Sequence, residues 1–243
     1  MPVAQARCLA NTRLITFDLF DTLYRPKQPI GRTYAQPLWD HGLDVAEHAV
    51  AQSFIKSFKH THAEYPNYGK AAQLTSSQWW HLVIRRTWTN AGVDLQSHPL
   101  LVQKIPSVIQ HFATGAGYTM FPEVPKVLKY IRRKGIKMGV VSNMDESAEM
   151  ILKCLGIREY FDFVLKSITV GMEKPDPRIF EMALAAVNVP AYDALHVGDS
   201  VIYDFEPARK CGMEALVVCR DDKGKLQADP RYIRDLECIA KML

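Results

Sequence analysis

Residues 14–23 read LITFDLFDTL, and this stretch decides how the chain begins its fold. An apolar run from Leu14 to Phe17 ends at Asp18, and Asp21 and Thr22 follow shortly after. A short apolar run that gives way to polar residues is typical of a buried strand that opens into a loop. The sequence therefore predicts a strand over the apolar run and a polar loop after it.

Four more short apolar runs follow in the second half of the 243-residue chain, and a helical pattern precedes each of them. In one of these helices, Asp176 is predicted as the N-cap and Pro177 as the first helical residue. Strands separated by helices imply right-handed crossovers and a parallel sheet. The predicted fold class is therefore α/β, with a doubly wound parallel sheet. The four further strands are predicted at Met138–Val141, Phe161–Leu165, Ala194–Val197 and Ala215–Val218.

Residues from Leu23 to Thr114 depart from this alternation. Three helical patterns follow one another there, and no strand candidate separates them. The simplest interpretation is a helical insertion after the first strand, a second lobe that can lie over the strand ends. The predicted domains are a core formed by residues 1–22 and 115–243 and a helical cap formed by residues 23–114. The residues that define the three patterns are Tyr34, Leu38 and Trp39, then Val50, Phe54 and Phe58, then Trp79, Val83 and Trp88.

The composition is that of an ordinary globular protein, because 48% of the residues are hydrophobic and 23% are charged. Disordered and collagen-like chains are thereby excluded. The formal net charge is +4, and the insertion carries all of it, with nine Lys and Arg against five Asp and Glu. A basic lobe favours a small anionic substrate over nucleic acid, although a solvated helix face gives the same count.

The cysteines and the apolar segments bear on the compartment. Five cysteines form an odd set without CxxC spacing, which favours neither a disulfide framework nor a zinc site and fits a reducing interior. The longest uncharged stretch, residues 105–122, is too polar to cross a membrane. We expect a cytoplasmic protein without a membrane partner, with a nuclear location as an alternative. The leader, residues 1–13, is interpreted as a frayed terminus, with mitochondrial targeting as an alternative.

Polar residues follow the predicted strands at the points where each strand ends. They are Asp18, Ser142 and Asn143, Lys174, and then Asp199 with Asp204. In doubly wound folds the chemistry lies at the carboxyl ends of the strands, so we expect these side chains to converge on one site. Carboxylates, a hydroxyl and an ammonium group are what phosphoryl transfer on a Mg²⁺ site requires.

Four segments together resemble the motifs of the haloacid dehalogenase (HAD) superfamily, in order and at fitting spacing. They are residues 17–23, 141–143, 174–175 and 198–204. Two further segments, residues 65–69 and 74–80, resemble the subgroup called haloacid-dehalogenase-like hydrolase domain-containing protein three. The resemblance implies a hydrolase with a Rossmann-like core and a helical cap inserted after the first motif, in agreement with the patterning.

The resemblance also implies the catalytic roles. Asp18 would attack the substrate to form a covalent aspartyl intermediate, Ser142 would bond the transferring group, and Lys174 would hold the anion and the nucleophile together. Thr22 would brace the loop, and we place Thr22, Asn143 and Arg25 among the substrate-binding candidates. For Arg25 a solvated arginine is an equal alternative.

The same resemblance implies a metal site for Mg²⁺. Its ligands would be the carboxylates of Asp18 and Asp199 and the backbone carbonyl of Phe20. Asp204 would ligate the ion directly or through water, with a surface carboxylate at a helix start as the alternative for this residue. His196, inside a predicted buried strand, is interpreted as a hydrogen-bonded structural histidine.

One residue departs from the pattern of the superfamily's phosphatases. Their second aspartate, two residues after the nucleophile, protonates the leaving group, and here Phe20 stands in its place. Asp21 is an unlikely substitute, since one residue along an extended segment turns the side chain to the opposite side. Such a phosphatase should be slow, because general acid–base catalysis contributes roughly 10²–10⁴-fold.

The predicted function is a hydrolase, Mg²⁺-dependent, that acts on a small phosphorylated metabolite through an aspartyl intermediate. Two alternatives remain open at this stage. One is a non-catalytic regulatory protein that keeps the metal and anion site. The other is a metal-free 2-haloacid dehalogenase, which Phe20 favours and Asp199 opposes. The sequence does not determine the oligomeric state.

Overall fold

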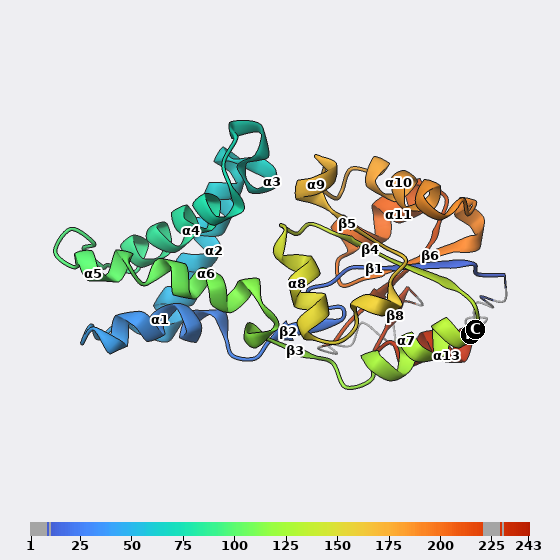
Figure 1. Cartoon of the computed structure of the whole chain (residues 1–243), viewed down its shortest axis with the longest axis horizontal. Coiled ribbons are helices and arrows are strands. Elements are labelled where there is room, and N and C mark those ends of the chain that lie inside the picture. The colour runs from blue at the N-terminus through green and yellow to red at the C-terminus, as the bar shows by residue number, and fades with distance from the viewer. Residues whose placement is uncertain (1–8, 10, 221–228, 230) are drawn as a thin grey trace. The chain divides into compact units, whose positions relative to one another are not determined.

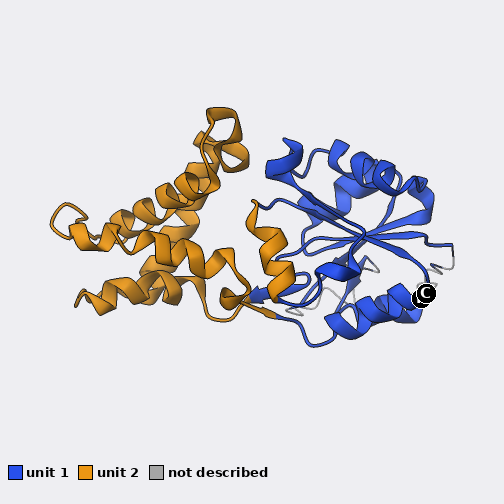
Figure 2. Ribbon diagram, viewed as in Figure 1, with its two compact units in different colours: residues 1–25, 120–144, 155–243 blue, residues 26–119, 145–154 orange. Residues whose placement is uncertain are grey.

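The structure is a computed structural model that describes residues 9, 11–220, 229 and 231–243 (Figure 1). Most of the leader that was interpreted as a frayed terminus, residues 1–8 and 10, lies outside the described residues. The chain divides into two compact units (Figure 2). The first, here called the sheet unit, comprises residues 1–25, 120–144 and 155–243, and the second, the helical unit, comprises residues 26–119 and 145–154.

A six-stranded parallel sheet forms the centre of the sheet unit, with strand order β5-β4-β1-β6-β7-β8. All five predicted strands are present, and the α/β fold class is confirmed. The sequence did not indicate β8, because two residues are too few to show the alternation of apolar and polar side chains that is typical of a strand. The strands are β1 (Leu14–Phe17), β4 (Lys137–Ser142), β5 (Phe163–Lys166), β6 (Ala194–Gly198), β7 (Glu214–Val218) and β8 (Tyr232–Ile233).

Helices cover both faces of this sheet. Figure 1 shows α10 (Arg178–Val187) and α11 (Glu206–Lys210) on one face, with α7 (Val124–Arg133) and α13 (Glu237–Met242) on the other. Ile179, Phe180 and Ala183 of α10 belong to a buried cluster that includes Leu14 of β1. The remaining helical segments of this unit are η3 (Arg158–Tyr160), α9 (Ser167–Val170), η4 (Ala191–Asp193) and η5 (Val201–Phe205).

The start of α10 differs by one residue from the prediction. Pro177 is the cap and Arg178 the first helical residue. The Asp176 carboxylate nevertheless accepts a hydrogen bond from the backbone N–H of Arg178, at 3.0 Å. Asp176 therefore satisfies an otherwise unpaired N–H of the first turn, which is the physical role expected of a capping aspartate.

The helical unit packs α1 (Ile30–Asp40), α2 (Glu47–Glu64), α4 (Ser76–Asn90) and α6 (Ile105–Ala113) around its own core. The three predicted helical patterns correspond to α1, α2 and α4. Trp79 and Trp88 are fully buried, as expected for core tryptophans. The chain also forms β2 (Tyr24–Pro26) and β3 (Tyr118–Met120), which pair as a two-stranded sheet and were not predicted. The shorter segments are α3 (Pro66–Gly69), η1 (Lys70–Ala72), α5 (Pro99–Val102) and η2 (Gly115–Gly117).

The helical unit also includes α8 (Ser147–Cys154), which follows the second motif in the chain. The Trp80 indole N–H donates to the Asp145 carboxylate at 2.7 Å, and the Ser76 hydroxyl donates to Glu146. A Cβ at Gly115 would lie 2.5 Å from the Cβ of Cys154, so α8 packs closely on this unit. The division thus differs from the predicted cap at residues 23–114, because these contacts are distant in sequence.

None of the helices among the described residues has both the length and the apolar character needed to cross a bilayer.

The segment at residues 66–69 contains consecutive left-handed residues. Asn67, Tyr68 and Gly69 have φ values of 47°, 57° and 74°. Gln73 is also left-handed, with φ 58°, and its side chain is exposed. A left-handed conformation costs an L-residue roughly 1–2 kcal/mol unless it is glycine.

We therefore expect Gln73→Gly to raise the free energy of unfolding by about 0.5–1 kcal/mol, since relief of the strain outweighs the entropy of a more flexible unfolded chain. Asn188, exposed with φ 53°, offers the matched control, since asparagine tolerates this conformation and Asn188→Gly should gain less. Urea denaturation would measure both. A loss of stability in Gln73→Gly would contradict the strain at this position.

Candidate active site

The candidate site forms where β1, β4 and β6 end at one edge of the sheet. Phe17, the last residue of β1, pairs with Val140 of β4 and Val197 of β6, so the residues that follow these strands are neighbours. The Asp18 backbone N–H donates to the Val197 carbonyl at 2.9 Å, which continues the ladder one residue further. Ser142 closes β4 as a buried residue at the same edge.

Three aspartates from this edge form one acidic cluster. Carboxylate oxygens of Asp18, Asp199 and Asp204 all lie within 4.8 Å of one another. Asp18 follows β1, Asp199 follows β6, and Asp204 comes from η5. Carboxylate oxygens at such spacing are the hard ligands that Mg²⁺ and Ca²⁺ prefer, so the residues present fit a divalent cation.

Lys174 supplies the positive charge of the cluster. Its side chain is 3% exposed, and its Nζ donates to Asp18 Oδ1 at 2.7 Å and to Asp204 Oδ1 at 2.5 Å. Asn143 fixes the Lys174 backbone from both sides: its Nδ2 donates to the Lys174 carbonyl at 2.8 Å, and its Oδ1 accepts from the Lys174 N–H at 2.7 Å. Both polar atoms of the Asn143 amide thus bond the lysine backbone, and its substrate role stays a prediction.

Asp204 is held by donors on both carboxylate oxygens. Besides Lys174, Oδ1 meets Nε2 of His196 at 3.0 Å, and Oδ2 accepts from the Ser200 N–H at 3.0 Å. The carboxylate lies directly over Gly198, where an added Cβ would sit only 2.1 Å from Asp204 Cγ. Only glycine fits at this position without displacing the carboxylate. His196 is fully buried and hydrogen-bonded, as predicted for a structural histidine.

The three carboxyl groups of the cluster differ in the direction and cause of their pKa shifts. Burial opposes ionisation of Asp204, but Lys174 and His196 hold its pKa well below the usual range. Burial raises the pKa of the Asp18 carboxyl group, and Lys174 opposes that rise. For Asp199, desolvation and the negative charges of Asp18, Asp204 and Asp21 raise the pKa to about 7. One ammonium group among three carboxylates leaves the cluster short of positive charge.

The loop after β1 holds the remaining predicted residues of the first motif. Phe20 is half-buried and bridges to Tyr24. Asp21 adopts a left-handed φ of 53°, so the segment is a turn at this point and the argument from an extended strand does not apply. Its charge contributes to the raised pKa of Asp199. Thr22 is buried, and its hydroxyl has no hydrogen-bond partner among the described residues.

Arg25 and Arg220 both contact the ring of Phe121. The Arg25 guanidinium lies 5.4 Å from the ring centroid, and Arg25 is exposed, so its predicted role in substrate binding stays a prediction. Arg220 stacks at 3.7 Å, donates to the Thr22 carbonyl at 2.6 Å and pairs with Glu123. These contacts, by which Arg220 clamps the loop after β1, were not predicted from the sequence. The available signal was a charged residue just beyond a predicted strand.

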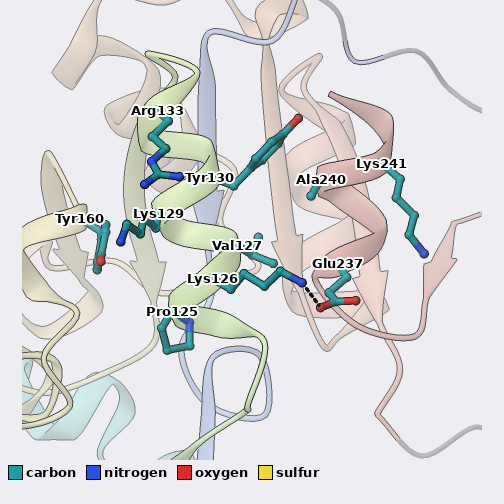
Figure 3. A pocket seen from close by; sticks show the side chains of 10 residues that line it. All are labelled: Pro125, Lys126, Val127, Lys129, Tyr130, Arg133, Tyr160, Glu237, Ala240 and Lys241. Atoms are coloured by element: carbon teal, nitrogen blue, oxygen red, sulfur yellow. Dashed lines mark hydrogen bonds and ion pairs between the residues drawn. The ribbon is translucent and has the colours of Figure 1, made fainter.

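A pocket of about 700 Å³ lies elsewhere in the sheet unit (Figure 3). Residues of α7, α13 and Tyr160 line it, and its rim carries the ion pair between Lys126 and Glu237, at 3.2 Å. No residue of the acidic cluster lines this pocket. The candidate site therefore rests on the convergence of side chains at the strand ends.

A doubly wound parallel sheet with a buried aspartate after its first strand, bonded to a lysine and grouped with two further aspartates, defines a class of hydrolytic enzymes. The chain belongs to the haloacid dehalogenase-like hydrolase family, whose model matches residues 12–212. The chain is 39% identical over 207 residues to the mouse (Mus musculus) haloacid dehalogenase-like hydrolase domain-containing protein 3, covering 85% of this chain and 81% of that protein. The resemblance drawn from the motifs is thereby confirmed.

Solved structures with this fold carry the names of two chemistries. A 2-haloacid dehalogenase from Pseudomonas syringae is 26% identical, with a TM-score of 0.63, and the match covers 95% of this chain and 97% of that one. A HAD phosphatase from Thermococcus onnurineus is 23% identical, with a TM-score of 0.61 and the same coverage, and its likeness concerns the fold alone. The protein is thus a HAD-like hydrolase, and its own residues must decide the reaction.

The raised pKa of Asp199 predicts a pH dependence of stability when divalent cations are chelated. Its carboxyl group titrates at about 7 in the folded chain and at about 3.9 when unfolded. Between these values the folded chain retains a proton that the unfolded chain loses, so the contribution of Asp199 to stability falls as pH rises. Compared with Asp199→Asn, the wild-type unfolding temperature should therefore fall between about pH 4 and pH 7.

The control for this measurement is Asp44→Asn, which removes an exposed carboxylate of the helical unit. Its profile should run parallel to that of the wild type. Thermal unfolding in the presence of a chelator gives all three profiles. Parallel profiles for the wild type and Asp199→Asn would refute the raised pKa.

Proposed function

We propose that the protein is a Mg²⁺-dependent phosphatase that acts on a small phosphorylated metabolite through a covalent intermediate on Asp18. The observation that carries the proposal is the charge of the acidic cluster: three carboxylates within 4.8 Å share a single ammonium group. Asp18 and Asp204 are buried and Asp199 lies at the exposed side of the cluster, and carboxylates held this close favour either protons or a cation. Asp18 and Asp199 would hold the cation, with the Phe20 carbonyl and Asp204 as further candidate ligands.

The proposed reaction proceeds in two steps at Asp18. A carboxylate oxygen of Asp18 forms a bond to phosphorus while the bond to the leaving alcohol breaks, and water then attacks the acyl phosphate to release inorganic phosphate and regenerate the carboxylate. Lys174 offsets the charge of the nucleophile and the phosphoryl group, and the Ser142 hydroxyl donates to phosphoryl oxygens. Mg²⁺, when bound, supplies positive charge for the phosphoryl oxygens.

The cluster also bears on the two alternatives. A metal-free dehalogenase would have to keep Asp199 beside Asp18 and Asp204 without a cation, which would leave part of the cluster protonated. Phe20 favours the dehalogenase, whereas Asp199 opposes it. The charge of the cluster is a second argument against the dehalogenase. A regulatory protein that binds but does not turn over would keep the same cluster, so only a measurement of turnover separates it from a phosphatase.

Phe20 sets the expected rate. Its phenyl ring carries no proton, so the leaving alcohol must take its proton from water or from another group. The charge distribution supports the proposed substrate class: the helical insertion carries the net positive charge of the chain, which suits a small anion. We infer a slow phosphatase with neither nucleic acid nor membrane as partner, located in the cytoplasm.

The first test is hydrolysis of a panel of phosphoesters with Mg²⁺. We expect release of phosphate that a chelator abolishes and that Asp18→Asn reduces by roughly 10³-fold or more, because the amide is not a nucleophile. Asp44→Asn is the matched control and should retain turnover. Equal rates for the wild type and Asp18→Asn would reject the proposal.

Two other results of the same panel would favour the alternatives. Thermal stabilisation by a phosphoester without release of phosphate would support the regulatory protein. Release of halide from a 2-haloacid in the presence of chelator would establish the dehalogenase. Each of these results rejects the phosphatase in a distinct way.

The second test restores the missing acid. Phe20→Asp places a carboxyl group two residues after the nucleophile, and we expect it to raise kcat by about 10²-fold, at the low end of what acid–base catalysis contributes. Phe20→Leu is the matched control, since it removes the ring without adding a proton donor. An equal rise in both variants would show that the ring, and not the missing acid, limits the rate.

A further inference from the structure

Two buried polar residues, Thr16 and His196, lie behind the acidic cluster. Both are fully buried, and they occupy paired positions on the neighbouring strands β1 and β6. Thr16 Oγ1 lies 2.8 Å from His196 Nδ1, and His196 Nε2 lies 3.0 Å from Asp204 Oδ1. Buried polar groups of this kind are costly unless they are hydrogen-bonded, so the contact requires an explanation.

The partners of Asp204 determine which His196 nitrogen carries the proton. Asp204 accepts hydrogen bonds from Lys174 at 2.5 Å and from the Ser200 N–H at 3.0 Å, so it is an ionised acceptor. Nε2 must then donate to it, because two lone pairs 3.0 Å apart would repel.

The protonation of His196 at Nε2 also determines where the Thr16 hydroxyl proton points. In a neutral ring that is protonated at Nε2, Nδ1 is an acceptor, and Thr16 Oγ1 is the donor 2.8 Å away. The other acceptor near this hydroxyl, the Leu195 carbonyl, is at 3.5 Å and is the weaker choice. The edge of the Phe180 ring, 4.8 Å away between centroids, holds the imidazole in its plane.

We propose that Thr16 and His196 are positioning residues that aim Asp204 at Lys174. The hydrogen bonds run from Thr16 through His196 to Asp204, and Lys174 bridges Asp204 to the nucleophile Asp18. The inference rests on the proposed function, in which Lys174 supports Asp18. Without the relay, Asp204 Oδ1 loses one of its two donors, so the Ser200 N–H and Lys174 alone orient the carboxylate that bonds the ammonium group, which itself lies 2.7 Å from Asp18.

Matched variants at both positions test the relay. His196→Leu removes both hydrogen bonds, whereas the amide of His196→Gln can donate to Asp204 and accept from Thr16. Thr16→Val removes the hydroxyl at nearly constant volume, and Thr16→Ser keeps it. Residues that orient a ligand group typically contribute about 10- to 100-fold to activity. We expect His196→Leu to lower kcat by about that factor with KM little changed, and His196→Gln to recover much of the loss.

Thr16→Val should lower kcat less than His196→Leu, and Thr16→Ser should recover that smaller loss. The double variant Thr16→Val, His196→Leu should be no slower than His196→Leu alone, because both changes break one chain of contacts. Full kcat in His196→Leu, or equal losses in the leucine and glutamine variants, would overturn the relay. Thermal unfolding shows whether His196→Leu folds. If it does not, Thr16→Val, which conserves volume, tests the relay instead.

A measurement that does not need turnover keeps the relay separate from the proposed function. In ¹H–¹⁵N spectra of the full chain, His196 should show a protonated Nε2 and an unprotonated Nδ1, and Thr16→Val should change the Nδ1 shift. A neutral ring protonated at Nδ1 alone, or an Nδ1 shift that Thr16→Val leaves unchanged, would overturn the relay. If the wild type hydrolyses no phosphoester, the phosphatase proposal fails, and these spectra still decide whether the relay exists.

Discussion

The candidate site depends on one buried ammonium group. Lys174 lies between Asp18 and Asp204, at 2.7 and 2.5 Å, and almost no water reaches it. Burying a charge is expensive unless it is paired and hydrogen-bonded, so the lysine and the two carboxylates are stable there only together. Asn143 supports this arrangement, because the oxygen and the nitrogen of its amide both bond the Lys174 backbone and so fix where the lysine side chain begins.

The parallel sheet makes this arrangement possible. Because β1, β4 and β6 run in the same direction and in register, a residue placed directly after each strand arrives at the same edge. Asp18, Ser142 and Asp199 reach the site in this way, each from a distant part of the sequence. Lys174 and Asp204 arrive from loops, and specific contacts hold them: Asn143 for the first, and Ser200 with His196 for the second.

Strands and strand-end residues were predictable from the sequence because each leaves a local pattern. The run from Leu14 to Phe17 and the polar residue after it are visible without any partner. Seven residues separate Lys174 from the end of β5, so its place in the site was predicted from the strand-end rule and the resemblance, and no local pattern indicates its contact with Asp18. The left-handed turn at Asp21, the clamp of Arg220 and the packing of α8 depend on contacts far apart in sequence, which no periodicity records.

The three aspartates of the cluster have different roles because their carboxylates have different hydrogen-bond partners. Asp204 Oδ1 accepts from both Lys174 and His196, which uses its two lone pairs, and Oδ2 accepts from Ser200 and packs against Gly198. Asp199 has the opposite character, because desolvation and the negative charges of Asp18, Asp204 and Asp21 raise its pKa to about 7. A bound cation would therefore be stabilised most by the negative charge of Asp199, because the Asp204 carboxylate already accepts hydrogen bonds from Lys174, His196 and Ser200. On this argument Asp18 is the acid that serves both the lysine and the proposed cation, since it bonds Lys174 through Oδ1 and also lies beside Asp199 in the cluster.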